Sequence, residues 1–419
     1  MVFSSLPFLF LFLTVVLLVS HLLPFKFRNF FLLLANLVFY AYGEPVYVLI
    51  MIASILVNFF AGVLMDKQPT QSRRRAVLVV GIVLNLAALG VFKYAGLFVD
   101  TLRGIPAFSS LPEVNIALPI GISFYTFQAV SYLIDVYWDD CEASHNFVNF
   151  ACYISLFPQL IAGPIVRYRD VNEQLVSRHE TPTLFNSGVR LFMVGMAKKV
   201  LLANQFGMLW ESVSADPVAA GAIGAWVGAC AYTLQIYFDF AGYSDMARGL
   251  GRMLGFEFCI NFNYPYISKS VTEFWRRWHI SLSTWFRDYV YIPLGGSRKG
   301  PWRTYRNLFV VWLLTGVWHG ANWTFLCWGL FYFLLLCLEK LGASGRPIPA
   351  PAGWAWTFLM VNFGWVLFRA PLSPRPWTIW APCSRRSAVP TSRLVDYWEQ
   401  SAAVILPSIL FSFPLGRWL

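Results

Sequence analysis

One histidine stands inside an apolar and aromatic stretch, "LLTGVWHGANW", which runs from Leu313 to Trp323. No carboxylate and no second histidine lies within ten positions of this residue, His319. Ionisable residues at membrane depth are rare and are usually functional. An imidazole with an ordinary pKa of about 6.5 stays neutral when it is desolvated, so it can accept a proton from a hydroxyl group. His319 is therefore a candidate general base; the alternative is a structural histidine that is hydrogen-bonded between helices.

A second candidate, His279, lies in the stretch "EFWRRWHISLSTWFRDYVYIPLGG". Tryptophan, tyrosine and arginine together are typical of the headgroup level of a membrane, so a structural role is the alternative for this histidine as well. The nearby arginines Arg276, Arg277 and Arg287 can pair with phosphate, with lipid headgroups, or with Glu273 and Asp288. We predict that Arg276 and Arg277 bind an anionic donor.

A motif with two aspartates, "IYFDFAGYSDMARGLG", follows an apolar segment. Asp245 stands three positions before Arg248, and Arg252 follows four positions later. Side chains at these spacings are neighbours on one helix face, so we expect charge pairing there. Asp239 has no obvious local partner, and we predict that it lines a polar cavity and contacts substrate or donor.

Other common catalytic patterns (GxSxG, HExxH and HxxxxD) are absent from the sequence. The loop "LGGSRKG" lacks the GxxxxGK[ST] pattern of a phosphate loop. Its Arg298 and Lys299 are expected at the cytoplasmic surface; the alternative is contact with a polyanionic donor such as coenzyme A. The seven cysteines contain no CxxC pair, so neither a disulfide framework nor a metal site is predicted.

The composition indicates a membrane protein. Of the 419 residues, 58% are hydrophobic and 13% are charged, whereas about 25% are charged in a soluble domain. Mean hydropathy is +0.57. The net charge of +11 comes from basic residues in short loops between apolar segments. This distribution follows the positive-inside rule, so we exclude nucleic acid as a partner.

Apolar segments that can cross or enter a bilayer recur along the chain, and we predict spans within residues 8–23, 30–42, 46–65, 76–99, 118–138, 188–206, 219–240, 308–318, 323–338 and 354–368. The basic loops "KFR" and "SRRR" alternate with loops that carry few basic residues. If these basic loops are cytoplasmic, the N-terminus is periplasmic. The protein is then a multi-pass protein of the bacterial inner membrane, in contact with lipid on its outer surface.

Two regions, at about residues 150–180 and 261–306, are predicted to be re-entrant or interfacial because prolines or dense arginines interrupt their apolar runs. The apolar run from Tyr305 to Trp318 has fourteen residues. As a helix it rises about 21 Å, less than a hydrocarbon core of about 30 Å. We therefore expect His319 to stop partway across the membrane. No internal repeat of the kind found in inverted-repeat transporters is present.

Several long motifs in this order resemble the membrane-bound O-acyltransferase (MBOAT) family. They are "LPIGISFYTFQAVSYLIDVYW", "FPQLIAGPIVRY", "YFDFAGYSDMARGLGRMLGF", "NFNYPYISKSVTEFWRRWHISLSTWFRDYVYIPLGGSR" and "WLLTGVWHGANWTFLCWGL". The similarity runs from about the N-terminus to Arg369. It implies an all-α polytopic membrane protein, a ring of roughly ten to twelve transmembrane and re-entrant helices around a thinned centre with funnels from both sides.

The resemblance also implies an enzyme. His319 is the expected catalytic histidine and His279 the second essential one, with Trp318 and Asn322 of the first motif predicted to contact substrate or donor. The implied reaction moves an acetyl group from a cytoplasmic donor, acetyl-CoA, to an exported polysaccharide such as alginate. Periplasmic partners of the SGNH-hydrolase type are implied, with no bound cofactor and no metal.

The family pattern ends after "NFGWVLFRA". We therefore predict an MBOAT-type membrane domain over 1–369, a divergent polar segment over 370–400, and a possible truncated last span over 401–419. A shifted reading frame is one hypothesis for this end.

Two alternatives stay open at this point. One is an acyltransferase with another acceptor, such as a lipid or a teichoic acid that receives D-alanine. The other is a transporter that moves an acyl donor without chemistry, which would be expected to show repeats or paired broken helices in two halves.

Overall fold

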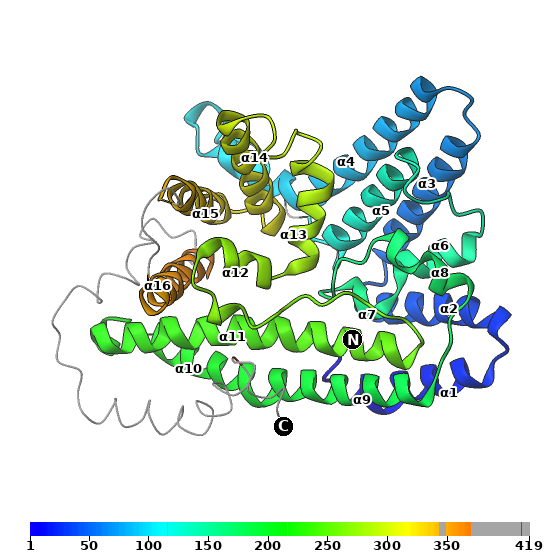
Figure 1. The fold of residues 1–419 in the computed structure, drawn as a ribbon, viewed down its shortest axis with the longest axis horizontal. Helices are drawn as coiled ribbons and strands as arrows, with labels where there is room; N and C mark the ends of the chain where they lie inside the picture. The colour runs from blue at the N-terminus through cyan, green and yellow to red at the C-terminus, as the bar shows by residue number, and fades with distance from the viewer. Residues whose placement is uncertain (115, 216, 343–348, 370–411, 413–419) are drawn as a thin grey trace. The chain divides into compact units, whose positions relative to one another are not determined.

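The computed structural model describes residues 1–114, 116–215, 217–342, 349–369 and 412. Every regular element within these residues is a helix (Figure 1), which confirms the all-helical part of the prediction. The chain divides into two compact units, Met1–Met193 with Ser244–Cys259, and Val194–Tyr243 with Ile260–Leu419. We call them unit 1 and unit 2.

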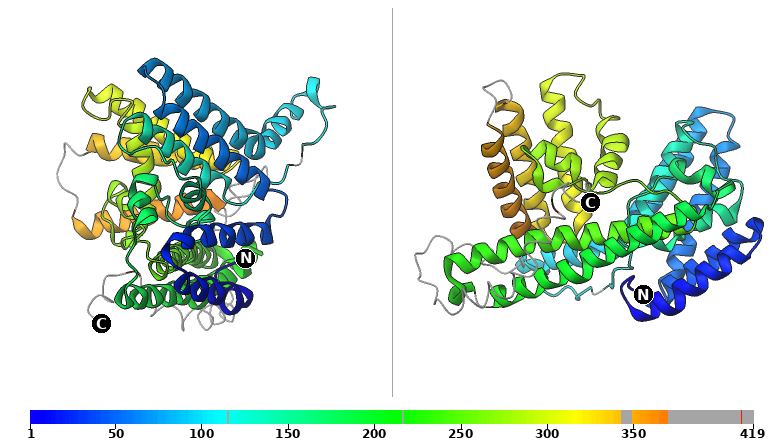
Figure 2. Two further views of the ribbon diagram at one scale, coloured as in Figure 1. Left: turned by 90° about the vertical axis from the view of Figure 1, so that its right-hand side faces the viewer. Right: turned by 60° about the horizontal axis from the view of Figure 1, so that its bottom comes forward.

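The first half of the chain forms η1 (Pro7–Leu13), α1 (Thr14–Leu22), α2 (Phe25–Gly43), α3 (Val48–Asp66), α4 (Gln71–Arg103), η2 (Pro106–Phe108), α5 (Ile122–Tyr137), α6 (Phe147–Ser155), α7 (Phe157–Leu160), α8 (Tyr168–Val176) and α9 (Pro182–Ala197). Helices α3, α4 and α5 pack on one another side by side (Figure 2). Asn58 and Asn85 join α3 to α4 through two amide hydrogen bonds of 3.0 and 2.7 Å. Such a pair satisfies polar groups inside otherwise apolar helices.

Three helices in the described part of the chain are long and apolar enough to cross a membrane, namely α3, α4 and α15 (Trp323–Gly342). Many of their apolar side chains face outward; Val80 and Phe60 are 57% and 60% exposed. Exposed apolar surface of this extent is expected where lipid replaces water as the solvent.

The remaining elements are η3 (Lys198–Ala203), α10 (Asn204–Ala215), α11 (Pro217–Met253), η4 (Pro265–Ile267), α12 (Val271–Arg277), α13 (Ile280–Phe286), η5 (Arg287–Tyr291), α14 (Pro301–His319), α15 and α16 (Ala350–Arg369). Helices α9 and α11 each continue from one unit into the other. In unit 2, α14 and α15 form a close pair, and α12 packs on α15 and α16.

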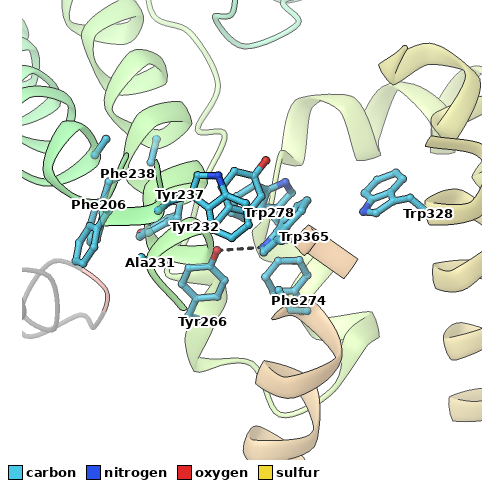
Figure 3. Packing of buried hydrophobic residues seen from close by; sticks show 14 of the residues in the cluster. Phe206, Ala231, Tyr232, Tyr237, Phe238, Tyr266, Phe274, Trp278, Trp328 and Trp365 are labelled. Carbon is cyan, nitrogen blue, oxygen red and sulfur yellow. Dashed lines mark hydrogen bonds between the residues drawn. The ribbon is translucent and has the colours of Figure 1, made fainter. Parts of the chain in front are cut away.

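Aromatic side chains fill the core of unit 2. The rings of Tyr266, Phe274, Trp278 and Trp365 lie close together within this core (Figure 3). Trp365 Nε1 donates a hydrogen bond of 3.2 Å to Tyr266 Oη, and Tyr266 Oη donates one to the carbonyl oxygen of Thr233. The polar tips of these rings are thus satisfied, so the large apolar area can be buried at little cost.

Helices lie along the stretches predicted to be spans, and three of these helices are long and apolar enough to cross a membrane. The other spans and the two interfacial regions stay predictions. Two helices differ clearly in their bounds from the predicted stretches. Helix α14 begins at Pro301, earlier than the apolar run, because Gly300 with φ of 94° leads into a proline at the first helical position. Helix α11 extends thirteen residues beyond 240, to Met253. The segments predicted at 370–400 and 401–419 lie outside the described residues, apart from residue 412.

Candidate functional site

Two short helices meet in a sharp bend at His279. Ser270 begins α12 by accepting a hydrogen bond of 3.0 Å from the backbone N–H of Glu273. The carboxylate of Glu339 on α15 accepts from the backbone N–H groups of Val271 and Thr272, the latter at 2.9 Å. A carboxylate at a helix N-terminus is favourable for both hydrogen bonding and the helix dipole. These caps fix the direction in which α12 enters the bend.

His279 itself has a left-handed backbone, with φ of 45° and ψ of 55°, between the end of α12 and the start of α13. Non-glycine residues adopt this conformation at an energetic cost, which is often accepted at functional positions. The side chain is buried, with 2% exposed. Its ring stands edge-on to Phe240, with 4.6 Å between centroids.

The structure brings His279 and His319 together through Trp318. The Trp318 ring lies 6.1 Å from the His279 ring and 4.9 Å from the His319 ring, both measured between centroids. Burial lowers the pKa of His279, and the like charge of a protonated His319 lowers this pKa further. His279 is therefore neutral at pH 7, as a proton acceptor must be.

His319 ends α14 and is enclosed by aromatic rings. Its ring centroid lies 4.9 Å from that of Trp328 on α15 and 5.1 Å from that of Phe368 on α16. Gly320 follows with an extended backbone and stops the helix. Three helices of unit 2 therefore meet around this one imidazole.

A cavity of about 560 Å³ opens beside the bend. Residues of α12, α13, η5, α14 and α15 and of the segments between them line it: Thr272, Trp275, Arg276, His279, Ile280, Leu282, Ser283, Thr284, Phe286, Arg287, Tyr291, Ser297, Leu308, Val311, Trp312, Thr315, Leu336 and Lys340. Its volume is in the range of small-molecule sites. The wall is mostly apolar and hydroxylic, and the lining residues carry cationic but no acidic side chains.

Two of the cavity cations are available to a ligand. Arg276 and Lys340 are exposed, and neither has a hydrogen-bond or ion-pair partner among the described residues. By contrast, Arg287 lies 2.7 Å from Asp288, and Arg277 lies 2.9 Å from Glu273. Pairs with local carboxylates, which the sequence allowed, therefore form at Arg277 and Arg287. Of the two arginines predicted to bind the donor, Arg276 lines the cavity and Arg277 does not.

The other predicted contact residues do not line this cavity. Asn322 caps α15, accepting a hydrogen bond of 2.9 Å from the backbone N–H of Thr324. Asp239 pairs with Lys199 at 2.6 Å, a partner forty positions away that local spacing could not indicate. The expected pairing of Asp245 with Arg248 is present at 3.5 Å. Substrate contacts by Asn322, Trp318 and Asp239 stay predictions.

Three residues near the site were not predicted from the sequence. Lys340 lies at the end of the α15 span, where a basic residue also fits the positive-inside rule. Trp275 lines the cavity and its indole Nε1 is buried without a hydrogen-bond partner in the structure. Asn261 lies eighteen positions before His279 and contacts it only through the fold. Within the described residues, no group of three or more His, Cys, Asp or Glu side chains could hold a metal ion.

The model of the membrane-bound O-acyltransferase family matches residues 142–369, which carry both histidines, Trp318 and the whole cavity. The chain belongs to the membrane-bound O-acyltransferase family. It is therefore a membrane enzyme that transfers an acyl group to oxygen, and the resemblance found from the sequence motifs is confirmed.

Other members of the family are similar over most of this chain. A probable alginate O-acetylase of Pseudomonas aeruginosa is 47% identical over 388 residues, 91% of this chain and 74% of that protein. A peptidoglycan O-acetyltransferase of Helicobacter pylori is 34% identical over 376 residues, 82% of this chain and 71% of that protein. A teichoic acid D-alanyltransferase of Streptococcus thermophilus is 33% identical over 234 residues, 52% of this chain and 56% of that protein.

Proposed function

We propose that this membrane-bound O-acyltransferase moves an acetyl group from cytoplasmic acetyl-CoA, across the inner membrane, to a hydroxyl group of an exported polysaccharide such as alginate. The observation that carries the proposal is a pair of imidazoles that both lie beside Trp318, one of which also lines a cavity with unpaired cations. The names of the relatives support acetyl as the acyl group and a polymer as the acceptor.

The cavity suits the donor. An acyl-CoA carries a narrow apolar and amide-containing arm that ends in the thioester, and phosphates at its other end. Arg276 and Lys340 are placed to bind phosphate, since charge-assisted hydrogen bonds to phosphate are the strong kind. His279 shares the wall with them, so a thioester in the cavity would lie near the histidine pair.

In the proposed reaction, the acceptor hydroxyl gives its proton to a neutral imidazole, His319, as its oxygen attacks the thioester carbonyl. A carbon–oxygen bond forms, the carbon–sulfur bond breaks, and the leaving thiolate takes up the proton. His279 would orient the donor beside this imidazole. The chemistry requires no electron transfer.

The arrangement in the membrane belongs to the same proposal. We infer a ring of roughly ten to twelve transmembrane and re-entrant helices with a thinned centre, a periplasmic N-terminus, and a second funnel that admits the acceptor. Periplasmic SGNH-hydrolase-type proteins would then receive the acetyl group or pass it on. The alternation of basic loops supports this orientation.

The function is tested in cells that export an acetylatable polysaccharide but lack their own O-acetylase. Expression of this chain should restore alkali-labile acetyl groups on the purified polymer, measured as released acetate. Purified protein in lipid vesicles should in addition release free CoA from acetyl-CoA. Vesicles that take up intact acetyl-CoA without releasing free CoA would favour a transporter and contradict the proposal.

Replacing Arg276 with glutamine should raise the KM for acetyl-CoA about tenfold, because one charge-assisted hydrogen bond contributes about 1.5–3 kcal/mol. The turnover number should change little, since the arginine binds donor in the ground and transition states alike. Steady-state release of CoA by the purified protein measures both constants.

The matched control is Arg277→Gln, the same change one position along α12. Arg277 pairs with Glu273 and does not line the cavity, so its KM should stay within about twofold of the unsubstituted protein. Equal effects of the two substitutions would show that the cavity cation has no special role.

A further inference from the structure

The side chain of Asn261 accepts hydrogen bonds from three groups at the bend between α12 and α13. Its Oδ1 lies 3.0 Å from His279 Nδ1, 3.2 Å from the backbone nitrogen of Ser281 and 2.9 Å from Ser281 Oγ. The residue is buried, with 1% exposed. Its backbone carbonyl also accepts from the N–H of Ile280 at 3.0 Å. Asn261 therefore faces the bend with both its main chain and its side chain.

The hydrogen bonds decide which way the amide of Asn261 points. A backbone N–H can only donate, so the atom that faces the Ser281 nitrogen must be the amide oxygen. The reversed amide would place two donors against each other. The same oxygen faces His279 Nδ1, and an oxygen of this kind can only accept. His279 Nδ1 must therefore carry a proton.

A neutral imidazole has one proton, so the lone pair of His279 is on Nε2. That nitrogen is buried, and it has no hydrogen-bond partner in the structure. Leaving a buried acceptor unsatisfied costs about 1–3 kcal/mol. The cost is recovered when a hydroxyl or thiol group of a ligand donates to Nε2. His279 lines the cavity, where such a group would arrive.

The geometry points to Asn261 as a positioning residue: it holds His279 in the tautomer that carries the proton on Nδ1 and presents Nε2 as the proton acceptor. Its part in acyl transfer rests on the proposed function, whereas the tautomer itself follows from the hydrogen bonds alone. An amide suits this task because it is uncharged. A carboxylate at the same place would favour the charged imidazolium.

The charged and titratable groups around His279 are known. His319 acts on it through space, and Arg276, Arg287 and Lys340 line the same cavity. Phe240 and Trp318 cover the ring and carry no charge. These groups, named from the part of the chain that the structure describes, are positive or can become positive. A carboxylate at position 261 would add a negative charge beside the His279 ring.

The tautomer is tested directly by solid-state ¹⁵N NMR of the full-length protein, labelled with [¹⁵N]histidine and reconstituted in lipid. The His279 signals are identified by their loss in His279→Gln. We expect a protonated Nδ1 and an unprotonated Nε2, and a shift of Nε2 toward the protonated type in Asn261→Leu. A protonated Nε2 in the unsubstituted protein at neutral pH would overturn the inference.

Kinetic measurements with acetyl-CoA distinguish loss of the His279 orientation from a general loss of folded protein. Asn261→Leu should lower kcat about 10²-fold, the order expected when a catalytic imidazole loses its orienting acceptor, with KM within about twofold. Asn261→Asp should recover most of kcat and move the acid limb of the pH–rate profile upward by about one unit or more. Ser281→Ala removes one donor to Asn261 but leaves the His279 contact, so it should keep kcat.

The outcomes distinguish this inference from the proposed function. A protein with the expected tautomer that transfers no acyl group would contradict the function and leave the tautomer assignment correct. An active protein in which Asn261→Leu keeps kcat, or Asn261→Asp restores nothing although it folds, would refute the positioning role alone.

Discussion

Replacing His319 with alanine should lower the rate of acyl transfer by about 10²–10⁴-fold, the usual contribution of a positioned general base. The KM for acetyl-CoA should change little, because His319 does not line the cavity proposed for the donor. The acetyl content of the exported polymer and the release of CoA by the purified protein both measure the loss. The protein should still accumulate in the membrane, since α14 keeps its close packing along α15.

A suitable control is His21→Ala, another histidine at the end of an apolar helix. His21 lies 3.6 Å from Glu180 and belongs to unit 1, so its loss should spare kcat. Normal acetylation by His319→Ala at equal protein levels would remove His319 from the mechanism.

The helices were largely predictable because membrane burial requires long apolar runs. The spans at 46–65 and 323–338 correspond to α3 and α15 within a few residues. Helix ends were less predictable where polar residues continue a helix. Helix α11 extends through "GYSDMARGLGRM", whose charges are paired in the fold, and no hydrophobic periodicity reports such pairing.

The candidate site was predictable only in part. His319 and His279 stand out because an imidazole is unusual in such surroundings, and their motifs identify the family. Sequence spacing does not reveal that Trp318 lies beside the His279 ring or that Asn261 is hydrogen-bonded to His279, since these contacts join separate elements. Asp239 illustrates the reverse case: it had no local partner and was predicted to line a cavity, yet the fold supplies Lys199.

Replacing Gly329 with valine should prevent most of the protein from folding. A Cβ atom at Gly329 would meet the backbone carbonyl oxygen of Trp312 and approach its carbonyl carbon to 3.3 Å. On the facing helix, a Cβ atom added at Gly316 would lie 2.5 Å from the backbone carbonyl oxygen of Phe325. Small residues at both positions let α14 and α15 approach closely, which is how membrane helices associate. Backbone atoms cannot move aside as a side chain can, so the substitution should lower the free energy of unfolding by about 1–3 kcal/mol or more.

The yield of monodisperse protein in detergent and its unfolding temperature measure this effect, and Gly342→Val is the matched control in the same helix. A Cβ atom at Gly342 meets nothing within 4 Å, so that substitution should leave the stability unchanged or raise it slightly, because valine favours a helix more than glycine does. Equal stability of the two variants would refute the close packing of α14 on α15. The packing matters for function because α14 ends in His319 and α15 carries Trp328, whose ring contacts that imidazole. A shift of one helix against the other therefore moves the proposed base itself.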